Sequence, residues 1–381
     1  MAPDDTQYLN KYENNSDEPN HIVVIGVGGG GNNAVNYMYR QDIQSVSFVV
    51  ANTDQQALNS SPVPTKLLLG PTVTRGRGAG AKPERARAAA EESAAEIDDI
   101  FDSDVDMVFV TAGMGGGTGT GAAPVVAEAA REMGILTVGV VTKPFWFEGR
   151  RRMQQAEAGI EELQSRVDSL VVIPNDRIKH VTDQKITFAN GFQISDDVLR
   201  QALLSITELI GKPGFINLDF ADVTTVMKGA GLAHMGVGSA AGKGKAEEAA
   251  RQAISSPLLE TSINGAKGVL VSITGSSDIG LDDVEAAAAM VQQAVHPDAN
   301  TIFGAAFDES MDDEIRVTII ATGFDEKKGA NAVAVSGIQG AVAGGSSKEK
   351  FDDLLLRPQT EEEKKADEKD PFEDILRIFD R

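Results

Sequence analysis

The most constraining feature of this chain is the segment 113–121, GMGGGTGTG, which holds six glycines and two threonines. It follows the apolar run 106–110 and precedes a helix-like segment at 122–133. A loop almost free of side chains exposes its backbone N–H groups, and the N-terminus of a following helix adds partial positive charge. A tight turn needs only one or two glycines, so this segment predicts an anion site.

Short apolar runs alternate with helical segments from residue 21 onward. The expected strands are 21–25, 47–50, 106–110, 136–141 and 169–173, and the expected helices are 33–40, 83–101, 122–133 and 151–167. This alternation predicts an α/β fold, a Rossmann-like parallel sheet with helices on both faces. Ligands of such sheets bind beyond the carboxyl ends of the strands, where the glycine-rich loops lie.

Apolar residues at helical spacing over 195–210 predict a long connecting helix, which ends at Lys212-Pro213-Gly214. Beyond it we expect a smaller α/β domain with a mixed sheet, with helices near 221–230 and 281–295 and strands near 268–274, 301–306 and 314–321. The expected organisation is a disordered arm (1–20), a nucleotide-binding domain (21–190), the connecting helix (191–214), the second domain (215–324), a disordered acidic linker (325–369) and a partner-binding peptide (370–381).

Composition narrows the class of protein. There are 57 acidic and 35 basic residues, a formal net charge of −22, which argues against a nucleic-acid binder. The chain has no cysteine, and its four histidines are scattered, so we expect no metal site built from these residues. We find no signal peptide and no segment able to cross a bilayer, which favours the cytoplasm.

The terminal peptide carries a possible recognition stripe of four apolar residues. They follow the i, i+3, i+4, i+7 spacing of one helix face: Phe372, Ile375, Leu376 and Phe379. Acidic residues outnumber basic ones around the stripe, whereas a membrane-surface helix favours lysine and arginine. We therefore expect this peptide to dock into the groove of a partner protein and not to insert into a membrane.

Two further segments have phosphate-binding character. Gly26–Asn33 satisfies G-x-G-x-x-G, and residues 74–80 alternate glycines before a helix. Three such loops on one sheet edge predict a triphosphate. No G-x-x-x-x-G-K-[ST] is present, which excludes a P-loop protein. Phe192 could stack on a base, and the Asp196 carboxylate could accept from the adjacent N–H groups of guanine.

Two alternatives stay open at this point. A nicotinamide-dependent dehydrogenase would use Gly26–Asn33 for the pyrophosphate and Asp54 for the ribose. The second, richer glycine loop and the lack of an evident hydride-transfer pair weigh against it. A nucleotide-binding scaffold of the same fold without turnover is the other alternative.

Several segments, in order, resemble those of the tubulin/FtsZ family, with the FtsZ branch as the match. They are 26–33, 52–54, 113–121, 142–149 and 174–176 in the first part of the chain, and 217–222, 253–259 and 316–323 in the second. The resemblance covers about 21–324 and is specific. It implies a GTPase that polymerises head to tail into filaments of the cytokinetic ring, at midcell under the inner membrane of a bacterial-type cell.

The resemblance also implies roles for individual residues. Gly28, Gly29, Gly30 and Asn33 line the first phosphate loop, Ala79 and Gly80 lie near the γ-phosphate, and Gly115, Gly116, Gly117, Thr118 and Gly119 hold the phosphates. Glu148 and Arg152 approach the ribose and phosphates, and Asn175, Phe192 and Asp196 the guanine. The implied cofactors are GTP or GDP with Mg²⁺, with K⁺ as a candidate monovalent ion.

Asn217, Asp219 and Asp222 are implied to enter the nucleotide pocket of the next protomer and to complete hydrolysis there. Residues 215–324 would thus form a GTPase-activating domain. Asp219 and Asp222 are spaced i, i+3 and can point the same way, although either one alone would more often be a helix N-cap. Division proteins and a membrane adaptor are the implied partners of residues 370–381.

Four features depart from the family pattern. Asn32 stands where a glycine is common, Arg77 adds charge to the loop near the γ-phosphate, and Trp146 replaces a small polar residue. The peptide 370–381 departs most, which leaves open which adaptor it recognises.

Overall fold

Six parallel strands form the first part of the sheet, and five of them lie at the predicted apolar runs. The computed structural model describes residues 20–324 apart from 42, 44–45, 102–103, 179, 181–186, 188–189, 212–218, 260–261, 277–278 and 309–310. Of the expected arm, the structure describes Asn20 alone. Asn217, the linker and the terminal peptide also lie outside the described residues. The strands are β1 (Ile22–Val27), β2 (Ser47–Asn52), β3 (Thr65–Leu68), β4 (Met107–Gly113), β5 (Leu136–Lys143) and β6 (Ser169–Pro174), in the order β3-β2-β1-β4-β5-β6.

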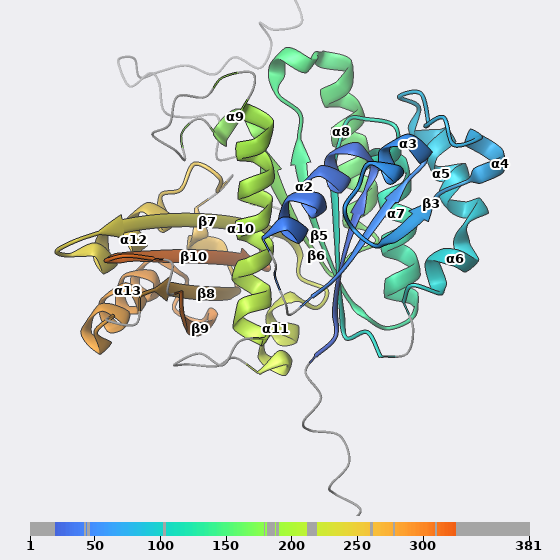
Figure 1. The fold of residues 1–381 in the computed structure, drawn as a ribbon. Helices are drawn as coiled ribbons and strands as arrows, with labels where there is room; N and C mark the ends of the chain where they lie inside the picture. Colours follow the sequence, from blue (N-terminus) through green and yellow to red (C-terminus); the bar gives the residue numbers. More distant parts are fainter. Residues whose placement is uncertain are drawn as a thin grey trace, which may run out of the picture. The chain divides into compact units, whose positions relative to one another are not determined.

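Helices cover both faces of these strands (Figure 1). One face packs against α2 (Gly28–Arg40) and α10 (Gly191–Gly211), and the other against α5 (Pro83–Glu92), α7 (Thr118–Glu132) and α8 (Arg150–Gln164). The shorter elements are α3 (Gln55–Asn59), α4 (Pro71–Thr74), α6 (Ala94–Asp98), η1 (Trp146–Glu148) and α9 (Asn175–Ile178). Burial on both faces explains why β1, β4 and β5, inside the sheet, are almost continuously apolar.

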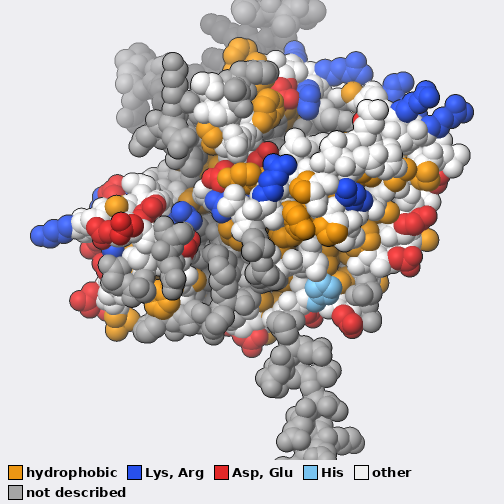
Figure 2. Space-filling view, viewed as in Figure 1, with side chains coloured by type: hydrophobic (Ala, Val, Ile, Leu, Met, Phe, Trp, Pro, Cys, Tyr) orange, Lys and Arg blue, Asp and Glu red, His pale blue; other side chains and the backbone are white. Residues whose placement is uncertain are grey.

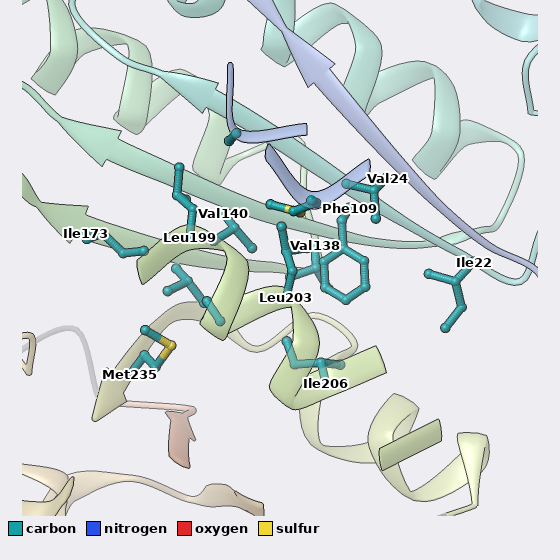
Figure 3. Close-up of a cluster of buried hydrophobic side chains, with 14 of the residues drawn as sticks. Ile22, Val24, Phe109, Val138, Val140, Ile173, Leu199, Leu203, Ile206 and Met235 are labelled. Carbon is teal, nitrogen blue, oxygen red and sulfur yellow. The ribbon is translucent and has the colours of Figure 1, made fainter. Parts of the chain in front are cut away.

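The long helix α10 joins the first part of the chain to the second. Leu199, Leu203 and Ile206 lie on its apolar stripe and are buried. They gather with strand residues such as Val138 and Ile173 in one cluster (Figure 3). Burying a leucine or isoleucine fully stabilises the fold by about 1.5–3 kcal/mol, so this stripe fixes α10 against the sheet.

The second part extends the same sheet. Its elements are α11 (Phe220–Met227), β7 (Gly231–Ala241), α12 (Lys245–Ile254), η2 (Ile263–Gly265), β8 (Gly268–Gly275), α13 (Leu281–Ala294), β9 (Asn300–Phe307) and β10 (Glu314–Thr322). The first residues of β7 pair parallel with β6, and its later residues pair antiparallel with β10. β10 pairs antiparallel with β8, and β8 parallel with β9, so the expected mixed sheet is confirmed.

Several elements differ from the expectation. The helix expected at 83–101 is broken at Ser93, because its buried hydroxyl accepts from Gly70 N (3.1 Å) and its φ and ψ leave the helical region. β3, β7 and α12 were not expected. In β7, a Cβ added at Gly236 or Gly238 would collide with a carbonyl of α12, so this strand needs the glycines that make it look unlike a strand.

No helix in the described part of the chain is long and apolar enough to span a bilayer.

Candidate functional site

The two principal glycine segments begin side by side because β1 and β4 are neighbours. Gly26 pairs with Thr111, and Val27 with Ala112, in parallel register. Both segments therefore leave the carboxyl end of the sheet at one point. α2 starts directly after β1, and α7 starts a short turn after β4.

These segments pack backbone against backbone. A Cβ added at Gly28 would lie 2.6 Å from the backbone nitrogen of Gly119, and one at Gly30 would lie 3.0 Å from the Cα of Gly113. Gly28 also has a φ of +74°, which side-chain-bearing residues rarely adopt. Glycine is thus required here for close approach, and the two segments form one surface of main-chain atoms.

Other glycines of the same loops face open space. A Cβ added at Gly29, Gly80 or Gly116 would meet no atom within 4 Å. Gly117, in contrast, lies against the third loop. A Cβ added there would be 3.0 Å from Lys82 N and 3.1 Å from Ala79 Cβ. The three loops therefore meet, and we call the main-chain surface that they share the cradle. A surface of this kind, with exposed backbone N–H groups, can bind a phosphate group.

The third loop is tied to the others through Thr53. Its carbonyl accepts from Gly78 N at 2.9 Å, and its hydroxyl lies 2.7 Å from the Thr118 hydroxyl. The neighbouring Asp54 caps α3, accepting from Gln56 N at 2.9 Å. The Asp54 carboxylate is thus already engaged with backbone where a dehydrogenase would use it for ribose, which weighs further against that alternative.

Glu148 and Arg152 meet beside the cradle. Glu148 Oε1 accepts from Phe145 N at 2.9 Å, and Arg152 Nε donates to Glu148 Oε2 at 3.1 Å. The Arg152 side chain lies against Gly115, since a Cβ added there would be 2.8 Å from Arg152 Cγ. The carboxylate therefore holds the exposed guanidinium next to the second glycine segment, where it can neutralise phosphate charge.

The residues expected around guanine come together at the start of α10. Asn175 Oδ1 accepts from the Ser195 hydroxyl at 2.7 Å, and both side chains are buried. Phe192 is exposed and contacts Phe145 edge-on, with ring centroids 5.4 Å apart. Burial raises the pKa of Asp196 to about 7, so this carboxylate titrates near neutrality.

Asp219 and Asp222 lie elsewhere. Asp219 is the N-cap of α11, its Oδ1 accepting from Ala221 N at 3.2 Å, and Asp222 is in the first turn. Both are exposed. α11 lies near the end of α10 opposite to its start, away from the carboxyl ends of the parallel strands (Figure 1). The two carboxylates are thus not part of this protomer's cradle.

The structure also shows the surroundings of Asn33, Asn32 and Arg77, which the sequence analysis singled out. Asn33 is exposed on α2, whereas Asn32 is buried there, and neither of its amide atoms has a hydrogen-bond partner within the described chain. Arg77 pairs with Asp54 through the backbone alone, and its side chain is exposed. Sequence reasoning missed Ser195, the donor that orients Asn175; its position next to Asp196 was the only available signal.

Two family models match this chain. A family model described as "Tubulin/FtsZ family, GTPase domain" matches residues 21–183, and one described as "FtsZ family, C-terminal domain" matches 231–325. An empty FtsZ dimer from M. jannaschii is 39% identical at a TM-score of 0.78, covering 90% of this chain and 100% of that chain.

Two further solved structures extend the comparison. A mutant FtsZ from M. jannaschii is 41% identical at a TM-score of 0.77, covering 84% of this chain and 94% of its own. CetZ2 from Haloferax volcanii, a GTPγS-bound protofilament, is 23% identical at a TM-score of 0.69, covering 81% and 95%. The last likeness concerns the fold alone.

Proposed function

This chain belongs to the FtsZ family of tubulin-like GTPases, and from that premise we propose that it assembles head to tail into filaments whose contacts complete each GTP site. The chain carries the GTPase domain of the family over 21–183. The identity of 39–41% to FtsZ of M. jannaschii, against 23% to CetZ2, favours the FtsZ branch. The structure of FtsZ from M. jannaschii at 39% identity is described as a dimer, which supports self-association as part of this proposal.

One observation carries this proposal: the exposed carboxylates of Asp219 and Asp222 lie at the end of α10 opposite to the cradle. α10 has 21 residues. At about 1.5 Å per residue it is roughly 30 Å long. Asp219 and Asp222 therefore act on the nucleotide of a second copy, with Asn217 as the third contributed residue. A contact of this heterologous kind that does not close generates a filament.

The chemistry divides between the two copies. The cradle of one copy holds the triphosphate through the N–H groups of its glycine segments and the Arg152 guanidinium, while Asn175, Phe192 and Asp196 hold the guanine. The carboxylates of the next copy orient the attacking water and accept its proton. Water adds to the γ-phosphorus as the bond to the β–γ bridging oxygen breaks, giving GDP and phosphate.

The side chains of the described residues also indicate how Mg²⁺ would bind. The described residues hold no group of three His, Cys, Asp or Glu side chains able to bind a metal. We therefore assign no Mg²⁺ ligand among the described residues and propose that the ion arrives on the phosphate oxygens, where it neutralises charge. K⁺ is a candidate second, monovalent ion.

At the cellular level we propose that the filaments form the cytokinetic ring at the division site. In this proposal, residues 21–190 bind GTP, 191–214 connect the domains, and 215–324 activate hydrolysis. Residues 325–369 form the linker, and 370–381 recruit a membrane adaptor and other division proteins from the cytoplasmic side.

The test compares wild type with Asp222→Ala and, as a control on the same helix, Thr225→Ala. GTP hydrolysis per protomer is measured against protein concentration, together with sedimentation. We expect wild type and Thr225→Ala to show a threshold at which hydrolysis rises with pelletable polymer. Asp222→Ala should bind GTP and assemble but lose hydrolysis. Flat hydrolysis without polymer, or undiminished turnover in Asp222→Ala, would refute the shared site.

A further inference from the structure

The third loop, residues 75–82 between α4 and α5, carries unusual backbone strain. Arg75 and Ala81, near its two ends, have φ values of +55° and +57°. Within the described residues, the only other side-chain-bearing residue at positive φ is Asp313. Residues other than glycine rarely adopt this conformation, and it persists only where the surroundings enforce it. Contacts from outside the loop must therefore hold it in place.

Charge adds to the tendency of this loop to open. Arg75, Arg77 and Lys82 are exposed, and like charges in one short loop repel one another. In Figure 2, Lys and Arg side chains gather along the upper right margin, near α3 and α4 in the same view of Figure 1. These charges attract a phosphate, but before the phosphate binds the loop needs other support.

Helix α5 presents a stripe of side chains toward α4, the short helix that leads into the third loop. Arg85, Ala89 and Glu92 follow i, i+4, i+7 spacing and share one face of α5. A Cβ added at Gly70, directly before α4, would collide with Ala89. The chain therefore crosses α5 in direct contact at this point, between the two charged residues of the stripe.

Both charged residues hold α4. Glu92 Oε1 accepts from Thr72 N and Glu92 Oε2 from Val73 N, both at 2.9 Å. Arg85 Nη2 donates to Val73 O at 3.0 Å. Hydrogen bonds from the Thr72 side chain and from the backbone of Val73 lower the pKa of Glu92, so its carboxylate is ionised at neutral pH. We call Arg85 and Glu92 the α5 clamp.

The buried hydroxyl of Thr74 connects α4 to the third loop. It donates to Gly70 O at 2.9 Å, and Gly76 N donates to it at 3.3 Å. Farther along, the loop lies against the second glycine segment, where a Cβ added at Gly117 would be 3.0 Å from Lys82 N. The α5 clamp is thus joined through α4 to one wall of the cradle, although neither clamp residue belongs to the cradle.

We propose that Glu92, with Arg85, is a positioning residue for nucleotide binding: the α5 clamp holds the strained third loop against the second glycine segment before the phosphates arrive. This inference rests on the proposed function, because it concerns the phosphate affinity of the same cradle. Without the clamp the loop relaxes, and only a fraction of the molecules keeps a binding-competent cradle. If that fraction falls to about one-tenth, the apparent Kd rises about tenfold.

The experiment measures equilibrium binding of GTP, GDP and GMP to the full chain below the assembly threshold. The variants are Glu92→Ala and Arg85→Ala, and the matched control is Glu91→Ala, at an exposed neighbouring position of α5. We expect Glu92→Ala to raise the Kd for GTP about tenfold and Arg85→Ala to raise it severalfold. Both losses should shrink as phosphates are removed, because other elements hold the guanine. The control should bind as wild type does.

Hydrogen–deuterium exchange of residues 74–82 separates a positioning role from a merely structural one. We expect exchange in this segment to rise in Glu92→Ala and to fall again when GTP is added in excess. Faster exchange with unchanged affinity, or equal losses for GTP, GDP and GMP, would overturn the inference. Because binding is measured without assembly, a wild type that forms no polymer would overturn the proposed function and not this inference.

Discussion

The raised pKa of Asp196 makes guanine-nucleotide binding depend on pH. Burial raises the pKa of this carboxyl to about 7 from the ordinary 3.8. Only the ionised form can accept from both adjacent N–H groups of guanine. The ionised fraction is roughly nine-tenths at pH 8 and one-tenth at pH 6, so the apparent Kd for GDP or GTP should rise about tenfold between these pH values.

The same shift affects the stability of the free protein in the opposite sense. Because the pKa of Asp196 is higher in the folded state than in the unfolded state, the folded state binds more protons between pH 4 and 7. The contribution of this group to stability is therefore fully present below about pH 4 and is lost as pH rises through 7. Nucleotide binding therefore requires the ionised form of Asp196, which is the form that destabilises the free protein.

The assay is equilibrium binding of a fluorescent guanine nucleotide from pH 5.5 to 8.5, below the assembly threshold. Asp196→Asn is the control, because it removes this titration while the phosphates of the nucleotide titrate equally in both samples. We expect Asp196→Asn to bind weakly with a shallow profile and wild type to lose affinity steeply below pH 7. Parallel profiles for the two proteins would refute the reasoning.

Four further changes test other parts of the structure. Gly121→Ala would collide with the first residue of α5 and should cost about 1–3 kcal/mol of unfolding free energy, measured by urea denaturation. Gly116→Ala meets no atom within 4 Å, so it should keep stability and lose nucleotide affinity; equal stability losses would contradict this contrast. Glu148→Gln keeps the backbone acceptor but frees Arg152, so GTP affinity measured by titration should fall severalfold, and no change would argue against their pairing. Arg177 donates to two carbonyl oxygens after α12, at 3.1 and 2.9 Å, so Arg177→Ala should cost about 2 kcal/mol or more, seen as a lower Tm.

Sequence patterns were most informative where burial dictates composition. Strands covered on both faces must be apolar, so the runs that became β1, β4, β5 and β6 could be located from their residues alone. β7 could not be located from its residues, because its glycines are required by contact with a neighbouring helix. Gly236 and Gly238 allow α12 to approach the strand closely, and no local pattern distinguishes such glycines from those of a loop.

The candidate site shows the same limit in its glycines. The sequence predicts that residues 113–121 bind an anion, but it does not distinguish Gly119, which packs against Gly28, from Gly116, which faces open space. That distinction depends on the pairing of β1 with β4. Similarly, a buried serine such as Ser195 acquires its role only when the fold brings it to Asn175.

The separation of the aspartates from the phosphates is the feature that most depends on tertiary structure. Asp219 begins α11 after a connecting helix of 21 residues, roughly 30 Å long. The apolar stripe of α10 is buried along the sheet, so this helix cannot bend to bring the carboxylates back to their own cradle. A chain built in this way holds its nucleotide at one end and its water-orienting groups at the other. Under the proposed mechanism, hydrolysis then follows contact between copies, and the packing of α10 is the physical reason for that dependence.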